Sequence, residues 1–202
     1  MSKAVYGMLI AAVLTLPITL QSAEKKAAAK KAPAKKSVVI GSQAPAFKIA
    51  DSSGKVIDLA KLTAKGPVLV RLTCGCSGCD KELAYFQELH KAYKGKGLTS
   101  LAIFREPDTK VEKYVKQKKL HMLYAVDSKG SSWNVFETKR MPTNFLIEKG
   151  GKIKSIADGC DPSGLLANAL SKKVANLLKT DAVDLQQAAK TKATTAKTTK
   201  KK

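Results

Sequence analysis

The middle of the chain switches repeatedly between two patterns of apolar residues. Short continuous apolar runs, rich in Val, Ile, Leu and Phe, predict buried strands, whereas apolar residues that recur every three or four positions predict helices. The predicted strands are residues 47–50, 56–59, 68–73, 98–104, 123–126, 144–147 and 152–156. The predicted helices are residues 81–93, a segment that follows Asp108, and a last helix from Asp161 and Pro162 to about Leu178.

The order of these elements predicts the fold class. Strands and helices alternate as far as residue 126, and the chain then continues with a hairpin and a helix. Turn-forming residues separate the first two strands at 51–54 and the last two at 148–151. We therefore predict an α/β arrangement: a central mixed β-sheet with helices on both faces, preceded by an N-terminal β-hairpin.

The N-terminal segment predicts export. With 202 residues, of which 44% are hydrophobic, the chain has room for one domain with extensions. Residues 1–23 have the basic start, apolar centre and small terminal residue of a signal peptide. Because Gln21 stands where a cleavage site usually has a small residue, an uncleaved membrane anchor is the alternative. Either outcome predicts a periplasmic or other extracytoplasmic domain.

Two lysine-rich segments carry about half of the net charge of +21. Residues 24–36 contain six Lys and one Glu, and residues 190–202 contain six Lys and no acid. Such composition predicts a disordered linker at 24–37 and a disordered tail at 181–202, on either side of a folded domain at 38–180. The lysines are either solvated tethers or contacts to an anionic envelope surface. Because no aromatic residue lies among them, specific nucleic-acid binding is not expected.

A Cys-x-x-Cys motif lies at the predicted junction between a strand and a helix. Cys76 and Cys79 follow the strand at 68–73 and precede a helix that begins near Asp80. Free amides and the helix dipole stabilise a thiolate there, so Cys76 is expected to ionise below the usual thiol pKa of about 8.5. Together with Cys74 and Cys160, these cysteines suit a redox site. Because the sequence has no second motif with metal-ligand spacing, we expect no cofactor and no bound metal.

Four motifs in a fixed order carry a family resemblance. They are Gly-Ser-Gln-Ala-Pro-Ala-Phe at 41–47, the hairpin at 51–62, the segment at 65–79 that leads into the cysteines, and Met-Pro-Thr-Asn-Phe-Leu-Ile at 141–147. In these motifs the chain resembles the thioredoxin superfamily, in its redoxin (AhpC/TSA-type) and TlpA-like branch of exported thiol-disulfide oxidoreductases. The resemblance covers about residues 38–172, and it implies that the domain at 38–180 is a redoxin domain with a thioredoxin-like fold.

The resemblance implies an enzyme that exchanges disulfides with protein clients and takes electrons from an upstream donor. It implies that Cys76 is the attacking thiol, that Cys79 resolves the mixed disulfide, and that these two form the redox-active disulfide. Pro142 corresponds to a cis-proline beside the dithiol, with Met141 and Thr143 next to it as client-binding residues.

A further implied residue is Glu82, three positions after Cys79. Some TlpA-like proteins have an acid there that exchanges a proton with the buried thiol, and the buried aspartate of ordinary thioredoxins is replaced here by Val70. The alternative for Glu82 is an exposed first-turn acid that interacts with the helix dipole. Gly75 stands where the family usually has Trp, which predicts a more open site.

Two other functions stay open at this point. A thiol peroxidase with antioxidant activity would use Cys76, and Thr73 fits part of the peroxiredoxin pattern, although Leu69 stands where that pattern has a proline. A copper-binding protein without turnover would use Cys74 and Cys76, whose side chains can converge on a soft metal. Cys160 either pairs with Cys74 or stays free.

Overall fold

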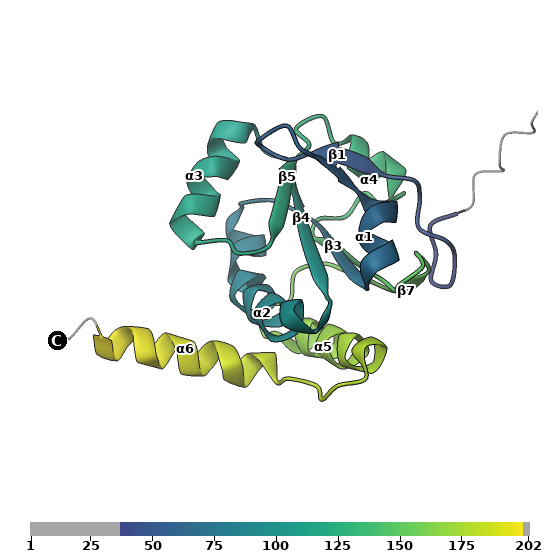
Figure 1. Ribbon diagram of the computed structural model, residues 1–202. Helices are drawn as coiled ribbons and strands as arrows, with labels where there is room; N and C mark the ends of the chain where they lie inside the picture. Colours follow the sequence, from purple (N-terminus) through teal and green to yellow (C-terminus); the bar gives the residue numbers. More distant parts are fainter. Residues whose placement is uncertain (1–36, 200–202) are drawn as a thin grey trace, which may run out of the picture. The chain divides into compact units, whose positions relative to one another are not determined.

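Five strands form the central sheet in the order β5-β4-β3-β6-β7 (Figure 1). The computed structural model describes residues 37–199. In this sheet β3 is parallel to β4 and β4 to β5, whereas β6 is antiparallel to both β3 and β7. The strands are β3 (Val68–Thr73), β4 (Thr99–Phe104), β5 (Leu123–Val126), β6 (Thr143–Ile147) and β7 (Ile153–Asp158).

A separate antiparallel hairpin precedes the sheet. Its strands are β1 (Lys48–Ala50) and β2 (Val56–Asp58), and Asp51 closes the turn by accepting hydrogen bonds from the Ser53 and Lys55 amides at 2.9 and 3.0 Å. The predicted α/β fold, with a mixed sheet, helices on both faces and an N-terminal hairpin, is therefore confirmed.

The helices bury two hydrophobic clusters, one on each face of the sheet. Side chains of β3 alternate between them: Leu69 belongs to the cluster with helices α2 and α5, and Val68 and Val70 to the cluster with the hairpin and helices α1 and α4. The helices are α1 (Leu59–Lys65), α2 (Ser77–Tyr93), the 3-10 turn η1 (Lys94–Lys96), α3 (Asp108–Lys118), α4 (Ser131–Val135), α5 (Leu165–Leu178) and α6 (Leu185–Thr199).

Local capping explains where the observed helices differ from the predicted ones. Helix α1, which the sequence pattern did not predict, begins because Asp58 accepts hydrogen bonds from the amides of Ala60 and Lys61. Helix α4 was not predicted either, because five residues are too few to show a helical period. Helix α2 begins at Ser77, four residues before the predicted start, so Cys79 lies inside its first turn.

The C-terminal segment corrects the prediction of a disordered tail at 181–202. Asp184 accepts hydrogen bonds from two amides of the first turn of α6, and Leu185 is fully buried against the core. Further along the helix, Lys192 forms an ion pair of 2.9 Å with Glu88 of α2. In Figure 1 α6 runs alongside α2 and α5. The lysine-rich composition concealed this anchor because the apolar residues and the cap stand together at the start of the segment.

The predicted signal peptide at 1–23 lies outside the described residues, as does the linker at 24–37 apart from its last residue. Between residues 37 and 199, no helix combines the length and the apolar character that crossing a membrane requires.

Tyr93 links the C-terminal segment to the core. Its side chain is fully buried, and its hydroxyl accepts a hydrogen bond from the Val183 amide (2.9 Å) and lies 2.7 Å from the Ser171 hydroxyl. We expect Tyr93→Phe to lower the free energy of unfolding by about 1–3 kcal/mol, because it leaves the partly buried Val183 amide without its acceptor. Urea denaturation measures this change.

Tyr124→Phe is the matched control, since its hydroxyl forms a hydrogen bond of 3.1 Å with Ser52 at an exposed position, and its loss should cost less than about 0.5 kcal/mol. Equal effects of the two variants would contradict the docking of this segment.

Candidate functional site

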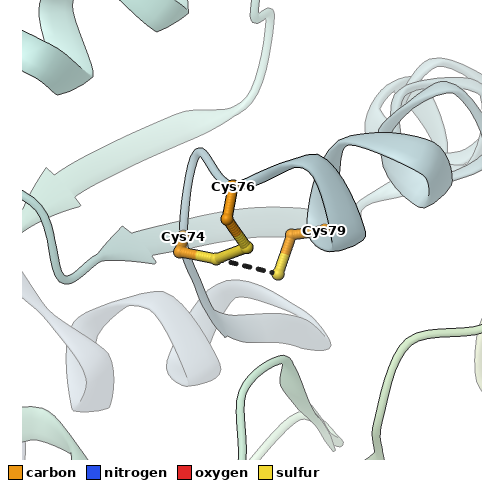
Figure 2. A group of neighbouring side chains, drawn as sticks. All are labelled: Cys74, Cys76 and Cys79. Atoms are coloured by element: carbon orange, nitrogen blue, oxygen red, sulfur yellow. Dashed lines mark hydrogen bonds between the residues drawn. A yellow bond between two sulfur atoms is a disulfide. The ribbon is translucent and has the colours of Figure 1, made fainter.

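Three cysteine side chains meet where β3 ends and α2 begins. Cys74 directly follows β3, Cys76 is the N-cap of α2, and Cys79 lies in its first turn. Their sulfur atoms all lie within 4.8 Å of one another. Figure 2 shows the three side chains turned toward a common point below the loop. The chain therefore brings three thiols together here, rather than the two that the Cys-x-x-Cys motif predicts.

The disulfide in the structure joins Cys74 to Cys76, and Cys79 is a free thiol. This differs from the predicted bond between Cys76 and Cys79. The loop at Gly75 turns back on itself, so the Cα atoms of Cys74 and Cys76 are 5.3 Å apart, within the range of about 4.4–6.8 Å that disulfides span. The Sγ atom of Cys79 lies 3.3 Å from the Sγ atom of Cys74. The exchange between Cys76 and Cys79 stays a prediction.

The three cysteines differ in their access to solvent. Cys76 is exposed, whereas Cys74 and Cys79 are each only 4% exposed. No side chain caps α2, so its first amides and the positive end of its dipole face the cysteine loop. An exposed cysteine at this position can meet a large reactant, whereas the two buried cysteines are shielded from one.

A buried ion pair lies behind the cysteines. Arg71 of β3 donates a hydrogen bond of 2.6 Å to Glu82 of α2, and both side chains are almost fully buried. Arg71 also donates to Asn144 of β6 (2.9 Å), and its guanidinium lies 4.0 Å from the centre of the Phe86 ring. The sequence analysis gives Arg71 no role. A charged residue inside a buried apolar run nevertheless indicates a buried ion pair, because such a charge needs a partner.

Glu82 is only 1% exposed. This excludes the alternative that it is an exposed first-turn acid. One carboxylate oxygen accepts from Arg71 and the other accepts from the Asp161 amide at 2.6 Å. Both oxygens thus have partners in the structure. Proton exchange with Cys79 stays a prediction.

The Met141–Pro142 peptide bond is cis, as the resemblance implied. Leu72 of β3 pairs with Thr143, so continuing this antiparallel register places Met141 and Pro142 beside the end of β3 and the cysteine loop. Met141 is 39% exposed. Thr143 is fully buried and its hydroxyl donates to the Arg140 carbonyl at 3.0 Å, so its side chain is not available to a client.

A cavity of about 320 Å³ opens beside Cys76. Its lining includes Phe104, Val111 and Tyr114, with Lys110 and Lys113 among its polar residues. At position 75, where the family usually has Trp, a Cβ atom would lie 3.2 Å from the Tyr114 ring. The more open site expected from this glycine stays a prediction.

Two carboxylates, those of Glu106 and Asp80, accept hydrogen bonds from residues that line this cavity. Glu106 accepts a hydrogen bond of 2.7 Å from the Gly75 amide and so holds the loop between Cys74 and Cys76, a role that no pattern in the sequence indicated. Asp80 accepts from the Tyr114 hydroxyl at 2.9 Å. Burial and the nearby Asp80 carboxylate raise the pKa of Tyr114 well above its usual value, so this phenol stays protonated.

Cys160 is a free, exposed thiol and is not paired with Cys74. It donates a hydrogen bond of 2.7 Å to the carbonyl oxygen of Gly78, within the Cys-x-x-Cys motif. Desolvation, with the nearby Glu82 carboxylate and Cys79, raises the pKa of the Cys160 thiol. A thiol that stays protonated at this position is a weaker nucleophile than a thiolate.

Comparison with known proteins agrees with this geometry. The chain is 37% identical over 115 residues to the thiol-disulfide oxidoreductase ResA of Bacillus thuringiensis, in a match that covers 56% of this chain and 66% of that protein. It is 33% identical over 126 residues to the protein of the same name from Geobacillus thermodenitrificans, covering 62% of this chain and 72% of that one. This chain thus spans about two thirds of the length of these curated relatives.

A solved structure shares the fold. The crystal structure of a putative thiol:disulfide interchange protein DsbE from Chlorobium tepidum matches with a TM-score of 0.64 and 26% identity, over 70% of this chain and 99% of that one. The AhpC/TSA family model matches residues 40–156, which include all of the site described above except Cys160 and Asp161. The chain therefore belongs to the AhpC/TSA family and has a thioredoxin-like fold.

Proposed function

We propose that this protein is a thiol-disulfide oxidoreductase that exchanges disulfides with protein clients through Cys76. The observation that carries the proposal is an exposed cysteine at the N-terminus of α2 with two buried cysteines beside it, their three sulfur atoms all within 4.8 Å of one another. The names of the curated relatives and the shared fold support the same chemistry.

The reaction is two successive thiol-disulfide exchanges. In the reduced protein the Cys76 thiolate attacks one sulfur of a client disulfide, which forms a mixed disulfide and releases the other client sulfur as a thiolate. The Cys79 thiolate then attacks the Cys76 sulfur and releases the second client thiolate. The client gains two electrons and this protein holds a disulfide, which an upstream dithiol donor reduces again.

Cys74 is a second candidate for the resolving step. Its sulfur is bonded to that of Cys76 in the structure, so the loop geometry allows this pair to close. The oxidised pair can also rearrange, because Cys79 lies 3.3 Å from Cys74 and its attack there releases Cys76 as a free thiolate. We therefore assign Cys76 two alternative partners, Cys79 from the helix and Cys74 from the strand.

The surroundings of Cys76 suit an extended peptide. Met141 is partly exposed, and we propose that its backbone pairs with a client strand. The cavity on the other side of Cys76 offers apolar contact to Phe104 and Val111. The lysine-rich segments, by our proposal, add an electrostatic attraction to an anionic envelope surface in a periplasmic or extracytoplasmic location.

The thiol peroxidase alternative gains no support from the geometry around Cys76. Thr73, which fits part of the peroxiredoxin pattern, is buried and its hydroxyl donates to the Cys74 carbonyl at 3.4 Å. Rapid consumption of peroxide by the reduced protein would restore this alternative.

We infer that Glu82 exchanges a proton with the Cys79 thiol. The two residues are three positions apart on α2, so they share a face of the helix, and both are buried. A buried thiolate that forms during resolution needs a nearby group that accepts its proton.

The first prediction concerns catalysis. We expect the reduced protein to reduce the disulfides of insulin and Cys76→Ser to abolish this activity, because only the exposed sulfur can reach a client. The turbidity of the insulin B chain measures the rate. Cys160→Ser is the matched control and should keep the rate within about twofold, as serine retains a donor to the Gly78 carbonyl. Activity that survives Cys76→Ser would refute the proposal.

The second prediction separates the two resolving thiols. After acid quenching of a reaction with a disulfide-containing client, we expect the double variant Cys74→Ser/Cys79→Ser to accumulate the mixed disulfide with Cys76. Each single variant should accumulate much less, because one resolving sulfur remains. Non-reducing gels with mass spectrometry quantify the trapped complex. If Cys79→Ser alone traps as much as the double variant, Cys74 does not resolve.

The third prediction concerns Glu82. We expect Glu82→Gln to lower the free energy of unfolding by about 3–5 kcal/mol, because it leaves the buried Arg71 charge without its partner. We also expect it to change the pH dependence of Cys79 alkylation, measured in a background in which Cys79 is the sole cysteine. Urea denaturation and alkylation kinetics are the two measurements.

Glu88→Gln on the same helix is the matched control. Glu88 pairs with Lys91 and Lys192, which are both largely exposed, so its loss should cost about 1 kcal/mol or less and leave the alkylation profile unchanged. If Glu82→Gln destabilises the fold but leaves the pH profile of Cys79 unaltered, Glu82 has a structural role only.

A further inference from the structure

The cluster of three sulfurs has the dimensions of a metal site. Cys74, Cys76 and Cys79 each offer one sulfur, and these atoms lie within 4.8 Å of one another (Figure 2). Three thiolate sulfurs that each lie about 2.3 Å from one metal ion would be about 4 Å from one another. Once the bond between Cys74 and Cys76 is reduced, small rotations of the side chains suffice to reach this spacing.

The donor atoms select the kind of metal. Among residues 37–199 this is the one group of three or more His, Cys, Asp or Glu side chains with converging ligand atoms, and it contains sulfur alone. Thiolates without oxygen or nitrogen partners favour soft ions, chiefly Cu(I), Zn²⁺ and iron–sulfur clusters. Zinc and iron in such sites take four ligands. The remaining cysteine, Cys160, is not a fourth ligand here, because it stands outside the group and contacts the Gly78 carbonyl. A set of three sulfurs therefore fits Cu(I) best.

The position of the cluster suits a negatively charged complex. One Cu(I) ion with three thiolates carries net negative charge, and the uncapped N-terminus of α2 directs its amides and dipole toward this loop. The nearest buried charges, Arg71 and Glu82, compensate each other. Glu106 is bound to the Gly75 amide, and Lys110 and Lys113 line the cavity with it beside Cys76.

We infer that the reduced thiols of Cys74, Cys76 and Cys79 bind one Cu(I) ion. Two of the ligands are buried and Cys76 is exposed, so the ion enters and leaves from the side of Cys76. Binding displaces the thiol protons to solvent and leaves the copper oxidation state unchanged. A disulfide between any two of these cysteines removes two ligands, so oxidation of the site releases the metal.

The inference rests on the proposed function in one respect: in the cell, a dithiol must reduce the bond between Cys74 and Cys76. That step transfers two electrons and two protons to the disulfide and converts the donor dithiol to a disulfide. The test avoids this dependence by reducing the protein chemically.

The experiment is a competition for Cu(I) between the full chain and the chelator bathocuproine disulfonate, without oxygen and after reduction with a phosphine. We expect the wild type and Cys160→Ser to hold one Cu(I) per chain. We expect Cys74→Ser, Cys76→Ser and Cys79→Ser each to weaken binding by about 100-fold or more, since even the loss of an outer contact costs a metal site about 10–100-fold. X-ray absorption should show sulfur alone around the copper.

Three outcomes would overturn the inference. These are a wild type that yields all of its copper to the chelator, a Cys74→Ser variant that binds as tightly as the wild type, and a Cys160→Ser variant that binds as weakly as the other three. Insulin reduction, measured on the same preparation, separates the two proposals. A protein that reduces insulin but holds no copper refutes only the copper site, and one that holds copper but does not reduce insulin refutes only the proposed function.

Discussion

The Arg71 guanidinium lies inside the domain, where it contacts both α2 and β6. It donates to Glu82 of α2 and to Asn144 of β6, and it lies over the Phe86 ring. Glu82 in turn accepts from the amide of Asp161, in the connection between β7 and α5. A buried charge of this kind is costly unless every partner is in place, so the pair fixes how α2 lies against the sheet. That placement determines where Cys76 and Cys79 stand relative to the end of β3.

The sequence predicted best the elements whose structure follows from the pattern of residues within the element itself. The apolar runs of β3, β4 and β5 and the long amphipathic helix α2 follow from the pattern of apolar residues, and Gly150 and Gly151 mark the turn between the last two strands. The short helices α1 and α4 escaped prediction because they depend on a single cap or on packing. Helix α6 escaped because composition was averaged over a segment whose first residues alone are anchored.

The same distinction applies to the site. Motif spacing located Cys76 and Cys79, and the family resemblance implied the cis bond at Pro142, which the structure contains. Three features could not be predicted from the local pattern. The ion pair of Arg71 with Glu82 and the hydrogen bond from the Gly75 amide to Glu106 depend on contacts between separate segments. The bond between Cys74 and Cys76 is local, but it does not follow the spacing of the Cys-x-x-Cys motif. Of these, only the charge of Arg71 within an apolar strand was a visible signal.

The three cysteines come from parts of the structure with different constraints. Cys74 is held by the end of β3, Cys79 by the first turn of α2, and Cys76 by the loop between them. A bond between Cys74 and Cys76 lies within the loop, whereas a bond from Cys79 to either of them joins the helix to the loop or to the strand. The ion pair between Arg71 and Glu82 already holds strand and helix together, so the sulfurs stay within reach of one another whichever bond is formed. Exchange among the three sulfurs, and their joint binding of a soft metal, therefore require only side-chain rotation and no rearrangement of the fold.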